Sequence, residues 1–176
     1  MTKTNRYVEC SAAGMKYRLI PVTDEIIRCM IAKDEVKTEQ ESLIIEKKEY
    51  PQVPFEAAEA DGAVTVKTSA VQAELNLKTG GITWKHADGS VWLEQNKADL
   101  TRIDVVHYNT GGEKPIINRV KTVDGERNFI QNLKAEKVRD GYRARVFFDW
   151  KEDEEIHGLG QAEEGIYNYR EHTQYL

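Results

Sequence analysis

The sequence lacks the features that mark several specialised classes of protein. No apolar stretch reaches the roughly 18 residues that a membrane-spanning helix needs, and the N-terminus lacks the apolar core of a secretory signal. The 25 Lys and Arg residues are outnumbered by 30 Asp and Glu and are spread along the chain, so no basic patch points to nucleic acid. We therefore expect a cytoplasmic protein without a membrane or nucleic-acid partner.

Cysteine is also scarce. Cys10 and Cys29 are the only two in the sequence, and thiols at this spacing form neither a zinc motif nor a redox motif. Each lies in a segment of alternating apolar and polar residues, which predicts buried free thiols. A bridge between neighbouring strands is the alternative, and it would indicate an oxidising compartment.

The motifs of common enzyme classes are absent too. The sequence has no nucleophile elbow, phosphate-binding loop or paired Cys-x-x-Cys motif. GLGQ does not continue as a dinucleotide motif, because the third position after Gly160 is Glu163. The four histidines show no metal-ligand spacing, and no two of the many carboxylates stand out as a glycosidase pair. We expect no metal, no cofactor and no catalytic residue here.

What the sequence does contain is alternation of apolar and polar residues. The clearest example is VQAELNL at 71–77, which places four apolar side chains on one face, as a half-buried strand requires. Similar patterns occur at 6–12, 15–22, 25–32, 63–68 and 142–150. Short strands at this density, without a long amphipathic helix, predict an all-β chain folded as one antiparallel β-sandwich.

Turn residues separate these strands. Gly80 and Gly81 are predicted to take the positive φ angles of a tight turn, and residues 87–89 form a second turn, so the three strands around them make a meander. We expect loops at 46–62 and 108–128 and short helical turns at 39–48 and 125–133.

The last part of the chain carries a resemblance to a known family. HGLGQAEEGIYNYREHTQYL (157–176) resembles the segment that closes the N-terminal β-sandwich of glycoside hydrolase family 31, the α-glucosidase and α-xylosidase family. VTVKTSAVQAELNLKTGGITWKHADGSVWLEQ (64–95) and GERNFIQNLK (125–134) resemble the middle and the late part of that domain. The resemblance spans about residues 15–176 and implies a galactose-mutarotase-like sandwich.

The resemblance also implies a function for a larger protein. Residues 1–176 would be the single N-terminal domain of a retaining α-glycosidase, α-xylosidase slightly favoured over α-glucosidase, truncated before the catalytic barrel that bears the two catalytic aspartates. The expected partners are that barrel and, through the parent enzyme, an α-linked oligosaccharide. Alone, the chain is expected to be inactive and to associate with itself through an exposed face of tyrosines.

The same resemblance assigns candidate site residues. Asn168, Tyr169 and Arg170 match the family's Asn, aromatic and basic positions in a loop that shapes the sugar pocket. A tyrosine ring can stack on a sugar, while Asn and Arg donate hydrogen bonds to hydroxyls. Glu171 departs from the family pattern, in which Gly or Asp is usual, and this puts the shape of the loop in question. Docking against the barrel is the alternative role of these residues.

The turn before this loop is expected to be structural. Gly158 and Gly160 would supply a backbone bend, and Gln161 would form a hydrogen bond to a neighbouring strand or to a barrel loop. These three residues match the family's turn.

A different class of function stays open, namely a free-standing carbohydrate-binding sandwich. Trp84, Trp92 and Trp150 could provide a flat platform for a sugar, but their positions in the strand pattern favour core packing. An aldose epimerase is a second alternative. It would need a pair of histidines and a glutamate around the sugar, which the scattered histidines do not suggest.

Overall fold

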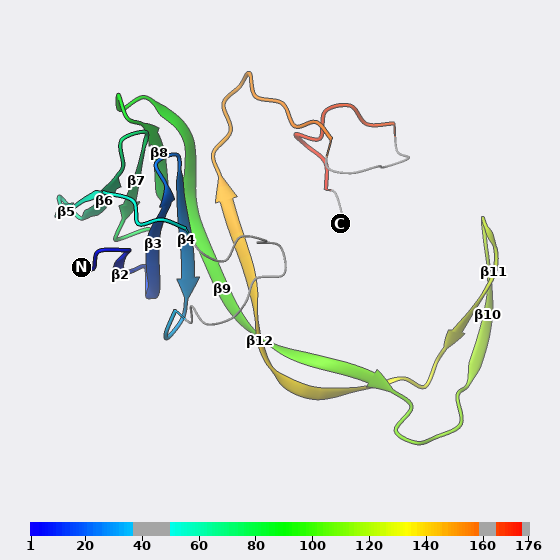
Figure 1. Cartoon of the computed structure of the whole chain (residues 1–176). Coiled ribbons are helices and arrows are strands. Elements are labelled where there is room, and N and C mark those ends of the chain that lie inside the picture. Colours follow the sequence, from blue (N-terminus) through cyan, green and yellow to red (C-terminus); the bar gives the residue numbers. More distant parts are fainter. Residues whose placement is uncertain (37–49, 159–164, 174–176) are drawn as a thin grey trace.

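The chain forms an all-β structure in which antiparallel strands build three sheets (Figure 1). The computed structural model describes residues 1–36, 50–158 and 165–173. Within these ranges there is no helix, and hence none that is long and apolar enough to cross a membrane. The predicted all-β class is therefore confirmed.

The first sheet has four strands in sequence order. They are β1 (Thr2–Lys3), β2 (Val8–Ala12), β3 (Met15–Thr23) and β4 (Ile26–Ala32). The predicted alternation is visible in their burial, since Val8, Tyr17 and Leu19 are fully buried while Lys16 is exposed. Each strand is joined to the next by a short connection, so the pairing is antiparallel throughout.

The second sheet has the strand order β12-β9-β8-β7-β6-β5. Its strands are β5 (Glu56–Ala60), β6 (Ala63–Lys67), β7 (Val71–Asn76), β8 (Ile82–His86), β9 (Val91–Asn109) and β12 (Lys134–Phe148). The meander predicted around the two turns is the β7-β8-β9 part of this sheet. A separate hairpin pairs β10 (Ile117–Thr122) with β11 (Gly125–Ile130).

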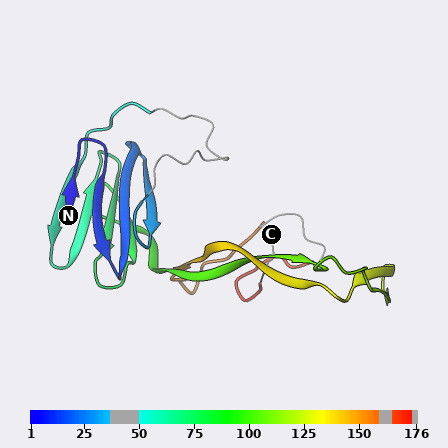
Figure 2. The same cartoon turned by 90° about the horizontal axis from the view of Figure 1, so that it is seen from below.

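The two larger sheets pack face to face and enclose one hydrophobic core. Side chains of β2, β3 and β4 meet those of β6, β7 and β8, and the largest fully buried ones are Tyr17, Leu19, Leu75 and Ile82. The Tyr17 hydroxyl donates a 3.0 Å hydrogen bond to the carbonyl of Gly80, which ties the sheets together at one end. The predicted β-sandwich is thus confirmed, and Figure 2 shows its two layers side by side.

Both cysteines lie in or beside this core, as free thiols. Cys10 is buried and Cys29 is partly buried. Burial raises the pKa of Cys29 to about 12, and it also raises the pKa of Cys10. The prediction of free thiols is confirmed, and the alternative disulfide does not form.

Beyond Leu100 the chain leaves the sandwich as a long two-stranded arm. We call residues 101–148 the ribbon; it comprises the rest of β9, the β10-β11 hairpin and β12, whose last residues, 144–148, return to the sandwich and pair with residues 95–100. Figures 1 and 2 show it as a single layer that extends away from the sandwich. No residue in the ribbon is buried, although residues 142–148 of β12 alternate in sequence as a half-buried strand would.

Three local predictions were wrong, each for a structural reason. Residues 125–133, expected to form a helical turn, begin with β11 because they pair with β10, and β10 in turn occupies part of the expected 108–128 loop. Part of the other expected loop, 46–62, is β5. The helical turn expected at 39–48 lies outside the described residues.

Gly81 also differs from expectation. Gly80 has the predicted positive φ of 72°, but Gly81 does not. A Cβ at Gly81 would lie 2.2 Å from the carbonyl oxygen of Asn96, far inside van der Waals contact. Glycine is required there by the close approach of β9, rather than by the turn conformation.

Candidate functional site

After β12 the chain continues as an irregular segment, residues 149–173, that contains the candidate loop. The segment begins beside the sandwich, where the Asp149 amide donates a 3.0 Å hydrogen bond to the Glu94 carbonyl and so extends the β9–β12 ladder by one residue. Figure 1 shows it departing from the end of β12 and running clear of the ribbon. No strand or helix forms in its described residues, so side-chain contacts and isolated backbone hydrogen bonds hold it in shape.

Asn168 joins the two halves of this segment. Its Oδ1 accepts hydrogen bonds from the backbone amides of Ile156, at 3.2 Å, and of Arg170, at 3.0 Å. The second bond is a local turn of the kind that Asn side chains favour. Asn168 therefore fixes the path of the loop through its carbonyl oxygen, whatever its amide group contacts.

Tyr169 is packed inside the segment. Only 5% of its surface is exposed, and its amide donates a 2.8 Å hydrogen bond to the Ile156 carbonyl. Its ring meets that of His172 edge to face, at a centroid distance of 6.4 Å. In this conformation the ring stabilises the loop and offers no open face for stacking.

Arg170 supports the same fold of the loop. Its Nη1 donates hydrogen bonds to the carbonyls of Glu152, at 2.6 Å, and of Glu154, at 3.0 Å. A charged guanidinium that bonds two backbone carbonyls stabilises an irregular segment more than a neutral donor does. Asn168, Tyr169 and Arg170 are therefore brought together, and all three hold residues 152–156 against residues 168–172.

The exposed groups of the loop lie next to this framework. Tyr167 is 80% exposed and stacks at a tilt on His157, with ring centroids 4.4 Å apart. His157 Nδ1 lies 2.8 Å from the Tyr167 carbonyl, and its Nε2 lies 2.9 Å from the Glu155 carboxylate. Glu171 is exposed as well. Tyr167, His157 and Glu171 are thus among the exposed groups that can meet something outside the segment.

The predicted turn is described only in part. Gly158 has a φ of 86°, a left-handed conformation that glycine adopts without strain, and nothing surrounds the position of a Cβ. Gly160 and Gln161 lie outside the described residues. Among the residues that the structure describes, no group of three His, Cys, Asp or Glu side chains could hold a metal ion.

Two of the three tryptophans lie elsewhere than predicted. Trp84 packs against the core, but Trp92 and Trp150 are 46% and 49% exposed. Both line a shallow cavity of about 90 Å³ between the start of β9 and the start of the irregular segment. A sequence signal existed, because each of these residues stands at a strand end with charged residues close by.

Comparison with known proteins gives a match in structure alone. No family model and no curated protein matches the chain. The crystal structure of the GH31 α-xylosidase from Xanthomonas citri matches with a TM-score of 0.66 and 20% sequence identity, over 96% of this chain and 16% of that enzyme. The chain therefore spans a small part of the enzyme's length. At this identity the likeness shows the fold: the chain has the architecture of one region of a family 31 enzyme, as the sequence resemblance predicted.

Proposed function

We propose that this chain is the N-terminal accessory β-sandwich of a retaining α-glycosidase of family 31, inactive by itself, which packs on a catalytic barrel and lends its loop to the sugar pocket. The observation that carries the proposal is the fold likeness, which covers nearly all of this chain and a sixth of an α-xylosidase. A region of that kind is an accessory part, and the rest of the enzyme must supply the chemistry.

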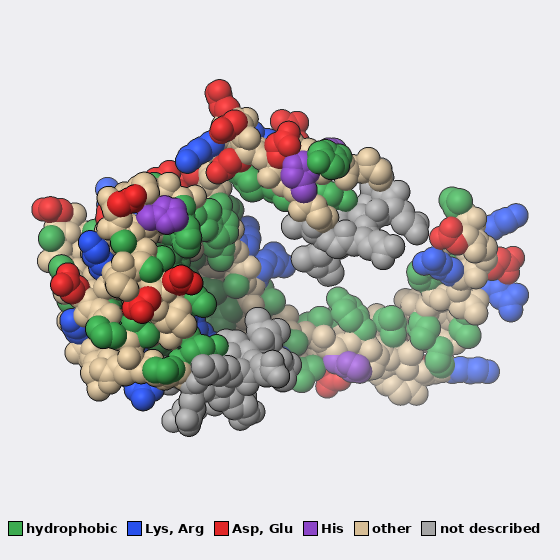
Figure 3. All heavy atoms as spheres, turned by 45° about the horizontal axis from the view of Figure 1, so that its top comes forward, with side chains coloured by type: hydrophobic (Ala, Val, Ile, Leu, Met, Phe, Trp, Pro, Cys, Tyr) green, Lys and Arg blue, Asp and Glu red, His purple; other side chains and the backbone are tan. Residues whose placement is uncertain are grey.

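The ribbon supports the idea that a large body of protein covers it. Apolar residues along it are exposed in numbers that a monomer does not usually tolerate. They include Ile116, Ile117, Val120, Phe129, Ile130, Leu133, Val138, Tyr142 and Val146. Figure 3 shows hydrophobic side chains gathered along the ribbon. A two-stranded ribbon of this length cannot form a core of its own, so we propose that the barrel packs on it.

The loop supports the second part of the proposal. Asn168, Tyr169 and Arg170 build a rigid frame, and this frame presents Tyr167 and Glu171 outward. Preformed loops on a rigid scaffold are common places for ligand contacts. We propose that the three framing residues position the loop at the mouth of the barrel, where a group of the loop meets the sugar.

Between substrates, α-linked xylose is favoured over glucose because the matched enzyme is an α-xylosidase. Retaining hydrolysis needs two carboxyl groups about 5 Å apart on either side of the glycosidic bond. We propose that both lie on the barrel, so that residues 1–176 contribute to binding and packing alone.

The proposal is tested by asking whether the chain binds a catalytic barrel and restores its activity. The chain is co-expressed with a family 31 catalytic barrel as a separate polypeptide, and the two are expected to purify together and to hydrolyse p-nitrophenyl α-xyloside, which the chain alone should leave intact. Val138→Asp, in the ribbon, should weaken the association, whereas the matched change Ile26→Asp, at an exposed residue of the sandwich, should not. Hydrolysis by the chain alone, or equal effects of the two variants, would contradict the proposal.

A further inference from the structure

The cavity beside Trp92 and Trp150 is a separate feature from the candidate loop. It lies where the first residues of β9 meet the residues that follow β12, next to the hydrogen bond between Asp149 and Glu94. The loop frame at 168–170 contributes nothing to its lining. The proposed function therefore leaves this cavity without a role.

The apolar part of the lining consists of Val91, Leu93 and two tryptophans, whose indole rings are the largest apolar groups in it. Trp92 and Trp150 are each about half exposed, so each combines a large apolar surface with an accessible one. The imidazole of His86 meets Trp92 edge to face, with ring centroids 5.0 Å apart, and this contact restrains the indole. A restrained, half-exposed indole can receive a flat apolar ligand at a small cost in conformational entropy.

The polar part of the lining offers donors and acceptors together. Glu94, Asp149 and Glu154 supply carboxylates, and Lys151 supplies an ammonium group. Neutral donors already occupy one oxygen of two carboxylates: Asn96 Nδ2 bonds Asp149 Oδ1 at 3.0 Å, and the Lys151 amide bonds Glu154 Oε2 at 2.9 Å. With an ammonium in the wall as well, the lining suits a neutral ligand that carries hydroxyl groups better than it suits a cation.

We infer that this cavity is a surface subsite for a single pyranose ring, with the ring against the indoles and its hydroxyls bonded to the carboxylates and to Lys151. A volume of about 90 Å³ is too small to enclose a sugar and can receive only one edge of it. Binding should therefore be weak, in the millimolar range. The inference goes beyond the proposed function, because it puts sugar contact at the β9–β12 end rather than in the loop.

The test titrates the whole 176-residue chain with methyl α-xyloside and methyl α-glucoside while the three indole N–H signals are followed by NMR. We expect saturable shifts of the Trp92 and Trp150 signals and none for Trp84, which packs against the core and serves as the internal reference. Trp92→Ala and Trp150→Ala should each weaken binding about tenfold. Tyr108→Ala, which removes an exposed aromatic from the ribbon, should change nothing.

Three outcomes would overturn the inference: no saturable shift for either glycoside, parallel shifts of all three indoles, or saturation by tetramethylammonium but not by the glycosides. The last outcome would identify a cation site. If an alanine variant fails to fold, Trp92→Phe and Trp150→Phe keep an aromatic face and should retain part of the affinity. Failure here leaves the association with a barrel untouched, so the two proposals can fail separately.

Discussion

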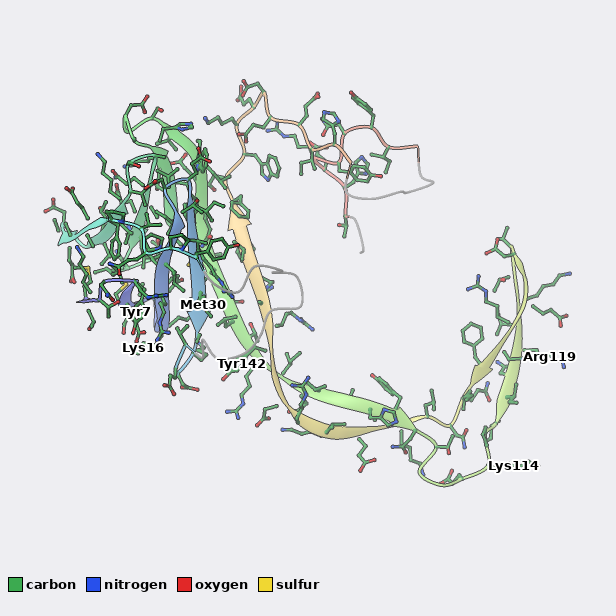
Figure 4. The ribbon with its side chains drawn as sticks, in the orientation of Figure 1. Tyr7, Lys16, Met30, Lys114, Arg119 and Tyr142 are labelled. Atoms are coloured by element: carbon green, nitrogen blue, oxygen red, sulfur yellow. The ribbon has the colours of Figure 1, made fainter. Side chains whose placement is uncertain are left out.

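The sandwich and the ribbon are built from the same kind of strand but differ in what covers them. In the sandwich, alternating strands of two sheets face each other and bury Leu19, Val66 and Leu75 completely. In the ribbon, residues 142–148 of β12 alternate in the same way, yet no residue of β12 is buried. Figure 4 shows Arg119 on the outlying hairpin and Tyr142 nearer the sandwich, and both side chains are exposed. Alternation thus specifies a strand, whereas burial requires a partner layer.

The largest expected effect tests this comparison with matched isoleucines. Ile82 is 1% exposed in β8 and Ile117 is 62% exposed in β10. Ile82→Ala should lower the free energy of unfolding by about 2–5 kcal/mol, because it leaves a cavity in a packed core. Ile117→Ala should change it by less than about 0.5 kcal/mol. Urea unfolding followed by circular dichroism measures both, and similar losses would mean that the ribbon is packed in solution.

The next effect concerns two glycines, one from each region. Gly81→Ala should cost about 3 kcal/mol, because its Cβ would collide with the backbone carbonyl of Asn96. Gly112→Ala, in the ribbon, should cost about 1 kcal/mol, since the site is open and only the φ of 82° opposes a side chain. The same unfolding measurement compares them. A smaller loss for Gly81→Ala than for Gly112→Ala would show that β9 moves away easily.

The sequence predicted the strands of the sandwich better than it predicted the ribbon. The period of two located β2, β3, β4, β6 and β7 and the faces they bury, because strand geometry alone sets that period. Alternation could not show that β9 and β12 extend beyond the sandwich. It also could not show that their side chains stay exposed there, because burial requires a covering layer that the local sequence does not encode. The 125–133 stretch was misread because its pairing with β10 outweighs local propensity.

The candidate site was predictable to a lesser degree. The resemblance selected the segment that contains Asn168, Tyr169 and Arg170, and the structure brings these three residues together; their contact with a sugar stays a prediction. Their hydrogen bonds to residues 152–156 depend on a loop path that carries no sequence period, so the framing role could not be read from the pattern. The exposure of Trp92 and Trp150 was missed because alternation shows which side chains share a face and not whether another layer covers that face; their position near strand ends was the only signal in the sequence.

The pH dependence of stability also distinguishes the two regions, because the sandwich core contains titratable groups whose pKa values are raised by burial. Burial raises the pKa of Tyr17 to about 12, from 10.0, and that of Cys29 to about 12, from 9.0. Both groups keep their protons to higher pH in the folded chain than in the unfolded one. Their contribution is therefore complete below pH 9.0 and is lost as the pH rises toward about 12.

We therefore expect the free energy of unfolding to fall as the pH rises from about 9 toward about 12. Cys29→Ala and Tyr17→Phe should each make that fall shallower, measured by urea unfolding at several pH values. Tyr142→Phe, at an exposed ribbon residue, is the matched control and should leave the slope unchanged. If neither core variant alters the pH dependence of the free energy of unfolding, groups other than Cys29 and Tyr17 cause the loss of stability at high pH.

Self-association tests whether the ribbon behaves as an uncovered surface. Of the tyrosines expected to form an exposed face, Tyr167 is exposed, Tyr169 is buried, and Tyr175 lies outside the described residues. The apolar ribbon is the larger surface, so Ile117→Lys should weaken any self-association about tenfold or more. Ile26→Lys, at an exposed isoleucine of the sandwich, should have little effect. Sedimentation velocity at several concentrations measures the self-association. Equal effects of the two variants would show that the ribbon is not the surface through which the chain associates.

The smallest expected effect compares one ion pair from each region. Arg18 and Glu9 bridge β3 and β2 at 2.7 Å with both side chains partly shielded, and the guanidinium also lies over the Tyr7 ring. Arg102 and Asp140 pair across the ribbon at the same distance, but their side chains are 69% and 47% exposed. A double-mutant cycle should give a coupling of about 1 kcal/mol for Arg18–Glu9. The ribbon pair should give less, and raising the salt from about 0.1 M to about 1 M should remove more of its coupling, since solvent ions reach both partners. If the ribbon pair proved the stronger and less salt-sensitive one, some part of the molecule must cover the ribbon in solution.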